Sequence, residues 1–215
     1  MKRPLTAILT SGALAASVMA AAAPASAGPV TGPEMLTVSE VAVVYPELAD
    51  AERIRSSGGI TAPRAVMQDG RLRCDRYRSF RGTSRRHTLF FETISEKSVT
   101  LGQHVVRMSG VADAKGVLRH YRRYVSACEG SHATTDGEGG RARMVVRAWQ
   151  APRVGDGSVG LLVAFAQHGT TTWRRTLVAR VGRSITAQEV EPYSGTGSAD
   201  RLVTLSQLAV ARLSG

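Results

Sequence analysis

This sequence contains no asparagine, and lysine supplies only three of its 28 basic residues. The absence of asparagine excludes the Asn-x-Ser/Thr site of N-glycosylation. The strong preference for arginine over lysine, together with abundant alanine, glycine and valine, is typical of a GC-rich genome and favours an actinobacterial source. The composition therefore indicates a source and excludes one modification, but it says nothing about mechanism.

The patterns that mark common catalytic and metal sites are also missing. Gly-x-Ser-x-Gly, His-Glu-x-x-His and Cys-x-x-Cys do not occur, whereas a hydrolase needs a nucleophile and a base oriented by a third group. The histidines lie in no recognised motif: His87, His104, His120, His132 and His168. We therefore predict a protein that is not an enzyme and has no metal site and no cofactor. A hydrolase of unknown class stays an alternative.

The first 27 residues have the three parts of a bacterial export signal. Lys2 and Arg3 precede an almost uncharged run of apolar and small residues over 5–23, and residues 25–27 read Ala-Ser-Ala, the pattern that signal peptidase recognises. We predict cleavage between Ala27 and Gly28. A retained membrane anchor is the alternative, but the run is rich in alanine rather than leucine, and an anchor needs about 20 strongly apolar residues. No later segment is apolar for that length, so we expect a secreted, extracellular chain.

Cys74 and Cys128 are the only cysteines. An even count in an exported chain predicts a disulfide, and with two cysteines the pairing is unique. Closing a loop of this length stabilises a fold by roughly 4 kcal/mol in the chain-entropy model. The alternative is a redox or metal pair, which the long spacing disfavours because metal sites need more ligands at short spacing.

Residues 35–215 are predicted to form one domain after a disordered leader at 28–34. Thr37 and Glu40 fit a capping box that starts a short helix toward Pro46. Apolar periodicity predicts further helices over 113–128 and 199–213, strands over 87–94 and 99–108, four strands joined by short turns between 141 and 190, and loops over 56–63 and 129–140. The predicted fold class is α+β, an antiparallel meander with flanking helices.

Positive charge dominates the mature chain. Without Lys2 and Arg3 it keeps 26 basic against 17 acidic residues, a net charge of +9. Residues 71–86 hold seven arginines and one acid. On the predicted meander, two neighbouring strands carry the candidate anion-binding residues Arg143, Arg147, Trp173, Arg174 and Arg175. Arginine binds phosphate or carboxylate bidentately and stacks on aromatic rings. The alternative is a solvated basic surface with ion pairs at its rim.

Four short motifs resemble the extracellular sensor domain of mycobacterial PknH-type serine/threonine kinases and its secreted relatives. They are residues 35–41, residues 111–114 with 124–130, residues 154–159 and residues 179–185. This sequence departs from the pattern at Tyr124, where tryptophan is common, and in its single possible disulfide, where members often have two. The resemblance implies a bent antiparallel sheet with flanking helices and a cleft taken to be a ligand site, without catalysis and without fixed ligand residues that can be transferred.

The expected function is therefore a non-enzymatic, sensor-like ligand-binding domain at the cell surface or in the wall. Its ligand would be an anionic wall polymer or a phosphate-bearing molecule rather than nucleic acid, and we expect a monomer. Besides a hydrolase, a protein-interaction module without a small-molecule site stays open.

Overall fold

The computed structural model describes residues 34–56, 60–80, 82, 84–91, 99–135, 139–192 and 195–214. The predicted export signal, its cleavage point, most of the leader and positions 92–94 of one predicted strand lie outside these residues. The helices are α1 (Val38–Val44), the short 3₁₀ helix η2 (Pro46–Leu48), α2 (Val111–Cys128) and α3 (Ala199–Ser214). The strands are β1 (Glu52–Ser56), β2 (Ile60–Gln68), β3 (Arg71–Phe80), β4 (Ser84–Phe91), β5 (Val99–Arg107), β6 (Gly130–Thr135), β7 (Arg141–Trp149), β8 (Gly157–Gln167), β9 (Thr170–Val181) and β10 (Ser184–Pro192).

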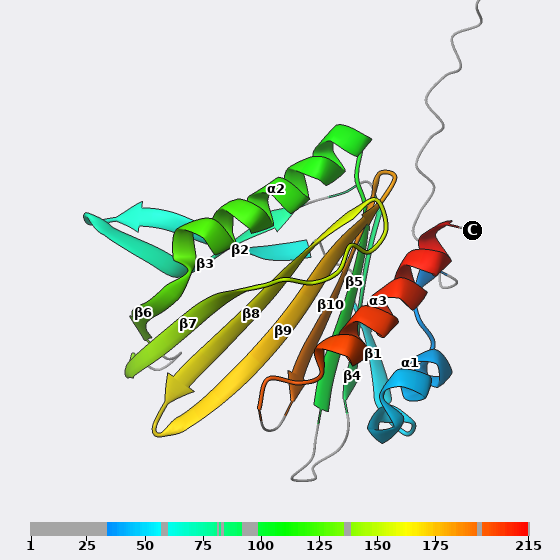
Figure 1. The fold of residues 1–215 in the computed structure, drawn as a ribbon, viewed down its shortest axis with the longest axis horizontal. Helices are drawn as coiled ribbons and strands as arrows, with labels where there is room; N and C mark the ends of the chain where they lie inside the picture. Colours follow the sequence, from blue (N-terminus) through cyan, green and yellow to red (C-terminus); the bar gives the residue numbers. More distant parts are fainter. Residues whose placement is uncertain are drawn as a thin grey trace, which may run out of the picture.

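Eight strands form one antiparallel sheet in the order β1-β4-β5-β10-β9-β8-β7-β6, and β2 and β3 form a separate hairpin (Figure 1). Strands β7 to β10 are consecutive neighbours, so the predicted meander and the α+β fold class are confirmed. The predicted turn at His168 and Gly169 joins β8 to β9. Both residues have positive φ, 48° and 78°, the backbone geometry of a tight two-residue hairpin turn.

Side chains alternate across the sheet and create two faces with different covers. On the first, which we call the α3 face, Leu177, Ala179 and Val190 pack with α1 and α3. On the second, the α2 face, Val178 and Ile185 pack with α2 and the β2–β3 hairpin. The core therefore lies in two layers on opposite sides of one sheet.

The predicted capping box and the predicted disulfide are both confirmed. Thr37 Oγ1 accepts a hydrogen bond from the Glu40 amide at 3.2 Å, and Glu40 Oε2 accepts one from the Thr37 amide at 2.9 Å. This capping box starts α1, and Glu40 also accepts a hydrogen bond from Arg212 of α3 at 2.6 Å. The disulfide joins Cys74 of β3 to Cys128 at the end of α2.

Two predicted loops are wrong. Residues 130–135 of the predicted loop 129–140 form the edge strand β6, which pairs with β7. This strand has small polar side chains and is held by backbone pairing, so it carries no apolar signal. Residues 60–63 of the predicted loop 56–63 begin β2. Pro63 is tolerated there because the hairpin has two strands, each with a free edge that needs no amide donor. Strand β1 was not predicted.

Among the described residues, no helix combines the length and the apolar character that a bilayer span requires.

Candidate functional site

The predicted anion-binding residues lie on β7 and β9, which β8 separates, so the prediction that their two strands are neighbours is wrong. The structure also divides these residues between the two faces of the sheet. Arg175 registers with Leu162 of β8, which registers with Arg147 of β7, so these two arginines share the α3 face. Arg143 and Trp173 lie on that face as well. Arg174 lies on the α2 face, because adjacent residues of a strand point to opposite sides.

On the α3 face, Arg147 and Arg175 stack on aromatic rings, and Arg175 also forms a hydrogen bond. The Arg147 guanidinium lies 5.3 Å from the ring centroid of Trp173, and that of Arg175 lies 4.8 Å from the ring centroid of Trp149. Arg175 is 8% exposed, and its Nε donates to the carbonyl oxygen of Thr196 at 3.1 Å. Arg175 therefore holds the segment that leads into α3.

Arg143 and Arg147 are exposed, and among the described residues neither forms an ion pair with a carboxylate. These two side chains therefore remain available to bind an anion. Anion binding by the predicted set stays a prediction.

Arg174 forms its contacts with acidic side chains of β10 on the α2 face. Its Nη2 lies 2.8 Å and its Nε 3.1 Å from Glu191 Oε2. Burial opposes the charge of Arg174, but Glu189 and Glu191 outweigh it and raise the pKa of the guanidinium above its usual value. The charge of Arg174 is therefore balanced within the protein.

Arg174 lines a cleft of about 160 Å³ between the α2 face, helix α2 and the β2–β3 hairpin, which we call the interior cleft. One wall is apolar and consists of side chains of β7, β8 and α2: Met144, Leu161, Val163, Phe165 and Tyr124. The other end is polar: Tyr77, His104, Arg174, Thr176 and Glu189. The cleft thus combines an apolar wall with charged groups at one end.

A disulfide and several hydrogen bonds hold the hairpin over this cleft. The disulfide fixes β3 to the end of α2. The Tyr124 hydroxyl donates to the Cys74 carbonyl oxygen at 3.0 Å, and Nε2 of His120 lies 2.8 Å from the Pro63 carbonyl oxygen. On the β6 side, the Thr134 hydroxyl donates to Asp75 at 2.9 Å. The cleft is therefore framed by anchored elements.

At the polar end His104 is largely buried, whereas Tyr77 and Arg174 are exposed. Burial, assisted by Arg174, lowers the pKa of His104 to about 4. Burial also raises the pKa of Tyr77, with Arg174 opposing this effect and Glu189 adding to it. At neutral pH His104 is an uncharged imidazole, and the net charge of this end comes from Arg174 and its two glutamates.

This cleft brings together a histidine, an acid and hydroxyl groups. Nε2 of His104 lies 3.9 Å from Oε2 of Glu189, which is beyond hydrogen-bond reach. A general base works best with a pKa near the working pH, and that of His104 is far lower. Within the described ranges, no cluster of His, Cys, Asp and Glu side chains is suited to hold a metal ion.

Sequence patterns indicated neither end of this cleft. His104 lies on a predicted strand and Leu161, Val163 and Phe165 on one face of another, but the β5–β10 pairing that brings His104 beside the meander is non-local. The alternation of β8 was the available signal, because it predicted which side chains share a face with one another.

Comparison with family models finds no match, and no curated protein sequence matches. Solved structures do. The extracellular domain of PknH from Mycobacterium tuberculosis gives a TM-score of 0.57 at 12% identity, over 86% of this chain and 98% of that one. LpqN, involved in cell envelope biogenesis of Mycobacterium tuberculosis, gives a TM-score of 0.28 at 15% identity, over 67% and 80%, a value too low to indicate a shared fold. The chain therefore has the fold of a PknH-like extracellular domain, and the predicted resemblance is confirmed at the level of fold.

Proposed function

We propose that this chain is a non-enzymatic, sensor-like binding domain that works outside the cytoplasmic membrane and takes the apolar part of a small ligand into the interior cleft. The observation that carries the proposal is the cleft itself. It has an apolar wall, a polar end and anchored sides, the combination expected of a small-molecule site.

The size of the cleft indicates what fits. A cavity of about 150 Å³ with apolar walls accommodates a benzene molecule, and the interior cleft has about 160 Å³. We infer an aromatic ring or a short branched alkyl group against Leu161 and Val163. The remainder of the ligand would project past the polar end toward Tyr77.

The extracellular location rests on separate support. The first 27 residues have the pattern of an export signal, and Cys74 and Cys128 form a disulfide, which persists in oxidising compartments. The fold is that of an extracellular domain in PknH. Together these features favour a secreted or surface-exposed protein over a cytosolic one.

Toluene tests the proposal as a minimal probe. We expect saturable changes in the methyl NMR signals of Met144, Leu161 and Val163 on titration. Val163→Phe fills the cleft and should abolish these changes. Val145→Phe adds the same volume on the α3 face of the neighbouring strand and should leave the Met144 and Leu161 responses intact. Equal responses in the two variants, or no saturable response in the wild type, would contradict a ligand site here.

A hydrolase in the same cleft is the second candidate, favoured by the proximity of His104, Glu189 and Thr176. Such an enzyme would lose turnover in His104→Gln, whereas the binding domain would keep its toluene response in that variant. Ester hydrolysis by the wild type that disappears in His104→Gln would favour the hydrolase.

A further inference from the structure

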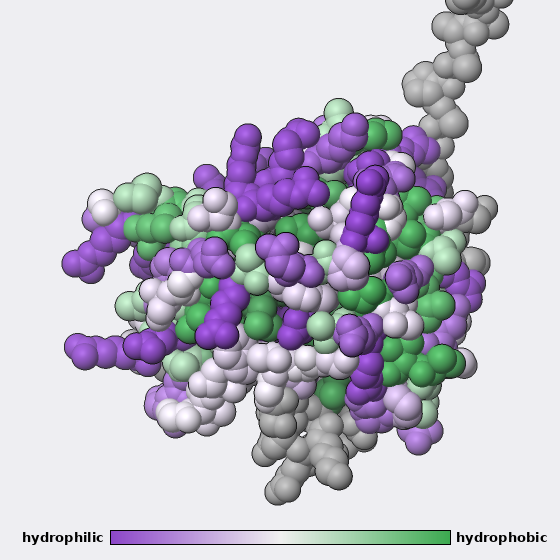
Figure 2. Space-filling view, viewed as in Figure 1, coloured by the Kyte–Doolittle hydropathy of each residue, from purple (hydrophilic) through white to green (hydrophobic). Residues whose placement is uncertain are grey.

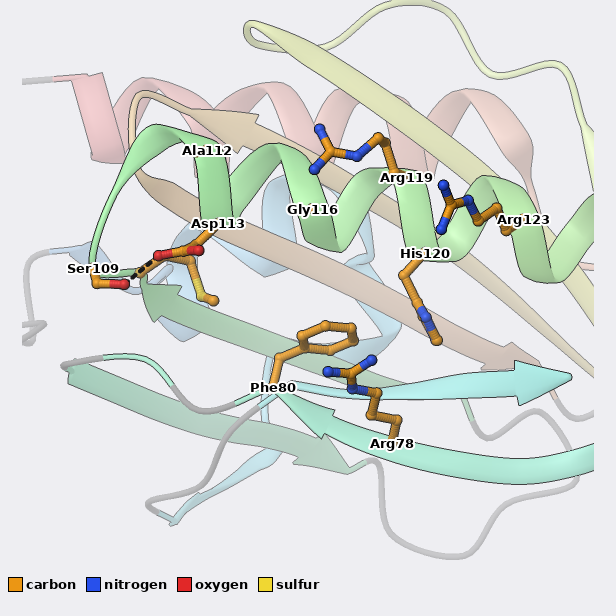
Figure 3. Close-up of a pocket in the computed structure, with 10 residues that line it drawn as sticks. Arg78, Phe80, Ser109, Ala112, Asp113, Gly116, Arg119, His120 and Arg123 are labelled. Atoms are coloured by element: carbon orange, nitrogen blue, oxygen red, sulfur yellow. Dashed lines mark hydrogen bonds between the residues drawn. The ribbon is translucent and has the colours of Figure 1, made fainter. Parts of the chain in front are cut away.

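A second, larger cleft lies beside α2 and is separate from the interior cleft. Its volume is about 500 Å³, and it is open to solvent between the exposed flank of α2 and the end of β3. Figure 3 shows Arg119, His120 and Arg123 on the helix above Arg78 and Phe80 on the strand. We call it the basic cleft.

Positive charge in the basic cleft is not balanced within the described part of the chain. There, no carboxylate forms an ion pair with Arg78, Arg119 or Arg123. Asp113, at the far end, accepts a hydrogen bond from Ser109 instead. In Figure 2, hydrophilic side chains gather over α2. This contrasts with Arg174, whose charge two glutamates balance.

The spacing on α2 makes this arrangement costly for the free protein. Lys115, Arg119 and Arg123 follow one another at four-residue intervals on exposed positions, so like charges are neighbours along one column of the helix. Like-charge pairs at this spacing destabilise a helix by a few tenths of a kcal/mol each. A bound anion would relieve that repulsion.

The floor of the cleft is ordered by ring contacts. The Arg78 guanidinium lies 4.9 Å from the Phe80 ring centroid, and the Phe80 ring meets that of His120 edge-on at 5.1 Å. Burial lowers the pKa of His120; its bond to Pro63 opposes this, and the positive charges of Arg78, Arg64 and Arg123 add to it. The positive charges of Arg78, Arg64 and Arg123 thus act on His120 in the same direction as burial.

From this geometry we propose that the basic cleft binds the phosphoryl group of an anionic ligand. Three arginines line the cleft, a guanidinium donates forked hydrogen bonds to phosphate oxygens, and the ring contact with Phe80 orders Arg78. Asp113 leaves the other end unfavourable for a second negative charge, which suits a compact phosphate ester rather than an extended polyanion. This site is independent of whatever occupies the interior cleft.

Glycerol 3-phosphate and inorganic phosphate are the probes for this site. In an amide NMR titration of the mature chain at fixed ionic strength, we expect saturable changes at Gly116 and His120.

Arg119→Gln/Arg123→Gln should weaken binding about tenfold or more, because charge-assisted hydrogen bonds are lost. Its thermal midpoint should not fall, since repulsion is relieved, and the single Arg119→Gln variant should show an intermediate loss. Arg71→Gln/Arg141→Gln removes the same charge from exposed arginines elsewhere and should bind like the wild type.

Two further arms complete the test. Arg143→Gln/Arg147→Gln should bind phosphate normally, and loss of binding there instead of in the α2 variant would overturn the proposal in favour of the α3 face. Equal weakening in all variants, or no saturable change in the wild type, would also overturn it.

Phosphatidylglycerol vesicles, compared with phosphatidylcholine vesicles, show whether the phosphoryl group belongs to a lipid headgroup or to a soluble ester. Binding that depends on Arg119 and Arg123 with vesicles indicates a lipid headgroup, and such binding with soluble probes alone indicates a soluble phosphate ester.

Discussion

The two clefts lie on either side of the β2–β3 hairpin and differ in how their arginines are partnered. In the interior cleft, Arg174 is paired with Glu191 and faces Glu189, and the wall opposite is apolar. In the basic cleft, Arg119 and Arg123 form no ion pair with a carboxylate of the described residues. A count of arginines therefore says little about where an anion binds, because the acidic partners decide which positive charge stays available.

Removing the disulfide should have the largest effect, because it anchors the hairpin that separates the clefts. The Cys74→Ala/Cys128→Ala variant opens a loop with a sequence separation of 54, and we expect a loss of about 4 kcal/mol in unfolding free energy. Urea denaturation measures this, with reduced wild type as the matched control. A loss below about 1 kcal/mol would show that the hairpin is held without the disulfide.

The pH dependence of stability distinguishes His104 of the interior cleft from His120 of the basic cleft. The folded pKa of His104 is about 4, below the usual 6.5, so the unfolded chain binds more protons between these values and stability falls as pH is lowered. We expect a loss of about 2 kcal/mol between pH 7.5 and 5 from this residue. His104→Gln should remove most of that slope in denaturation curves, and His120→Gln less. An unchanged slope in His104→Gln would mean that the imidazole is not desolvated.

Arg174 and Arg175 are neighbours in sequence but should differ in their contribution to stability. Arg175 is buried and donates to the Thr196 carbonyl oxygen, whereas Arg174 is in a more exposed ion pair. We expect Arg175→Met to cost about 1.5 kcal/mol more than Arg174→Met, because an exposed pair contributes at most about 1 kcal/mol. Thermal denaturation checks this order, and the reverse order would contradict the assigned contacts.

The smallest expected effect concerns the junction between α2 and the hairpin. Tyr124→Phe removes the donor to the Cys74 carbonyl oxygen and should lower the unfolding free energy by about 1 kcal/mol. Tyr121, also buried on α2, offers Tyr121→Phe as a comparison. No change in Tyr124→Phe would mean that this hydrogen bond does not stabilise the junction, which the disulfide and the His120–Pro63 contact would then hold.

Much of the fold could be predicted because the relevant signals are local. The periodicity of 113–128 and the alternation of the strands between 141 and 190 express burial on one face, and the capping box at Thr37 and Glu40 is complete within four residues. Strand β6 could not be predicted in this way, because its small polar residues bury little and its order comes from pairing with β7.

The candidate sites were harder to predict for the same reason. Alternation alone already separates Arg174 from Arg175, so the split of the predicted anion face was available in the sequence. What the sequence did not contain was the partner of each side chain, because Glu191 reaches Arg174 through strand pairing. The disulfide did hold a partial signal for the basic cleft, since it fixes β3 beside α2 and brings Arg78 near the arginines of that helix.

The most direct test of the account is a titration of one labelled sample with both probes. Toluene should shift the methyl signals of Leu161 and Val163 and leave the amide of Gly116 unchanged, and glycerol 3-phosphate should do the reverse. That result would establish two sites with different chemistry on either side of the hairpin. Phosphate-induced changes that centre on the Leu161 and Val163 methyls and spare Gly116 would contradict the account.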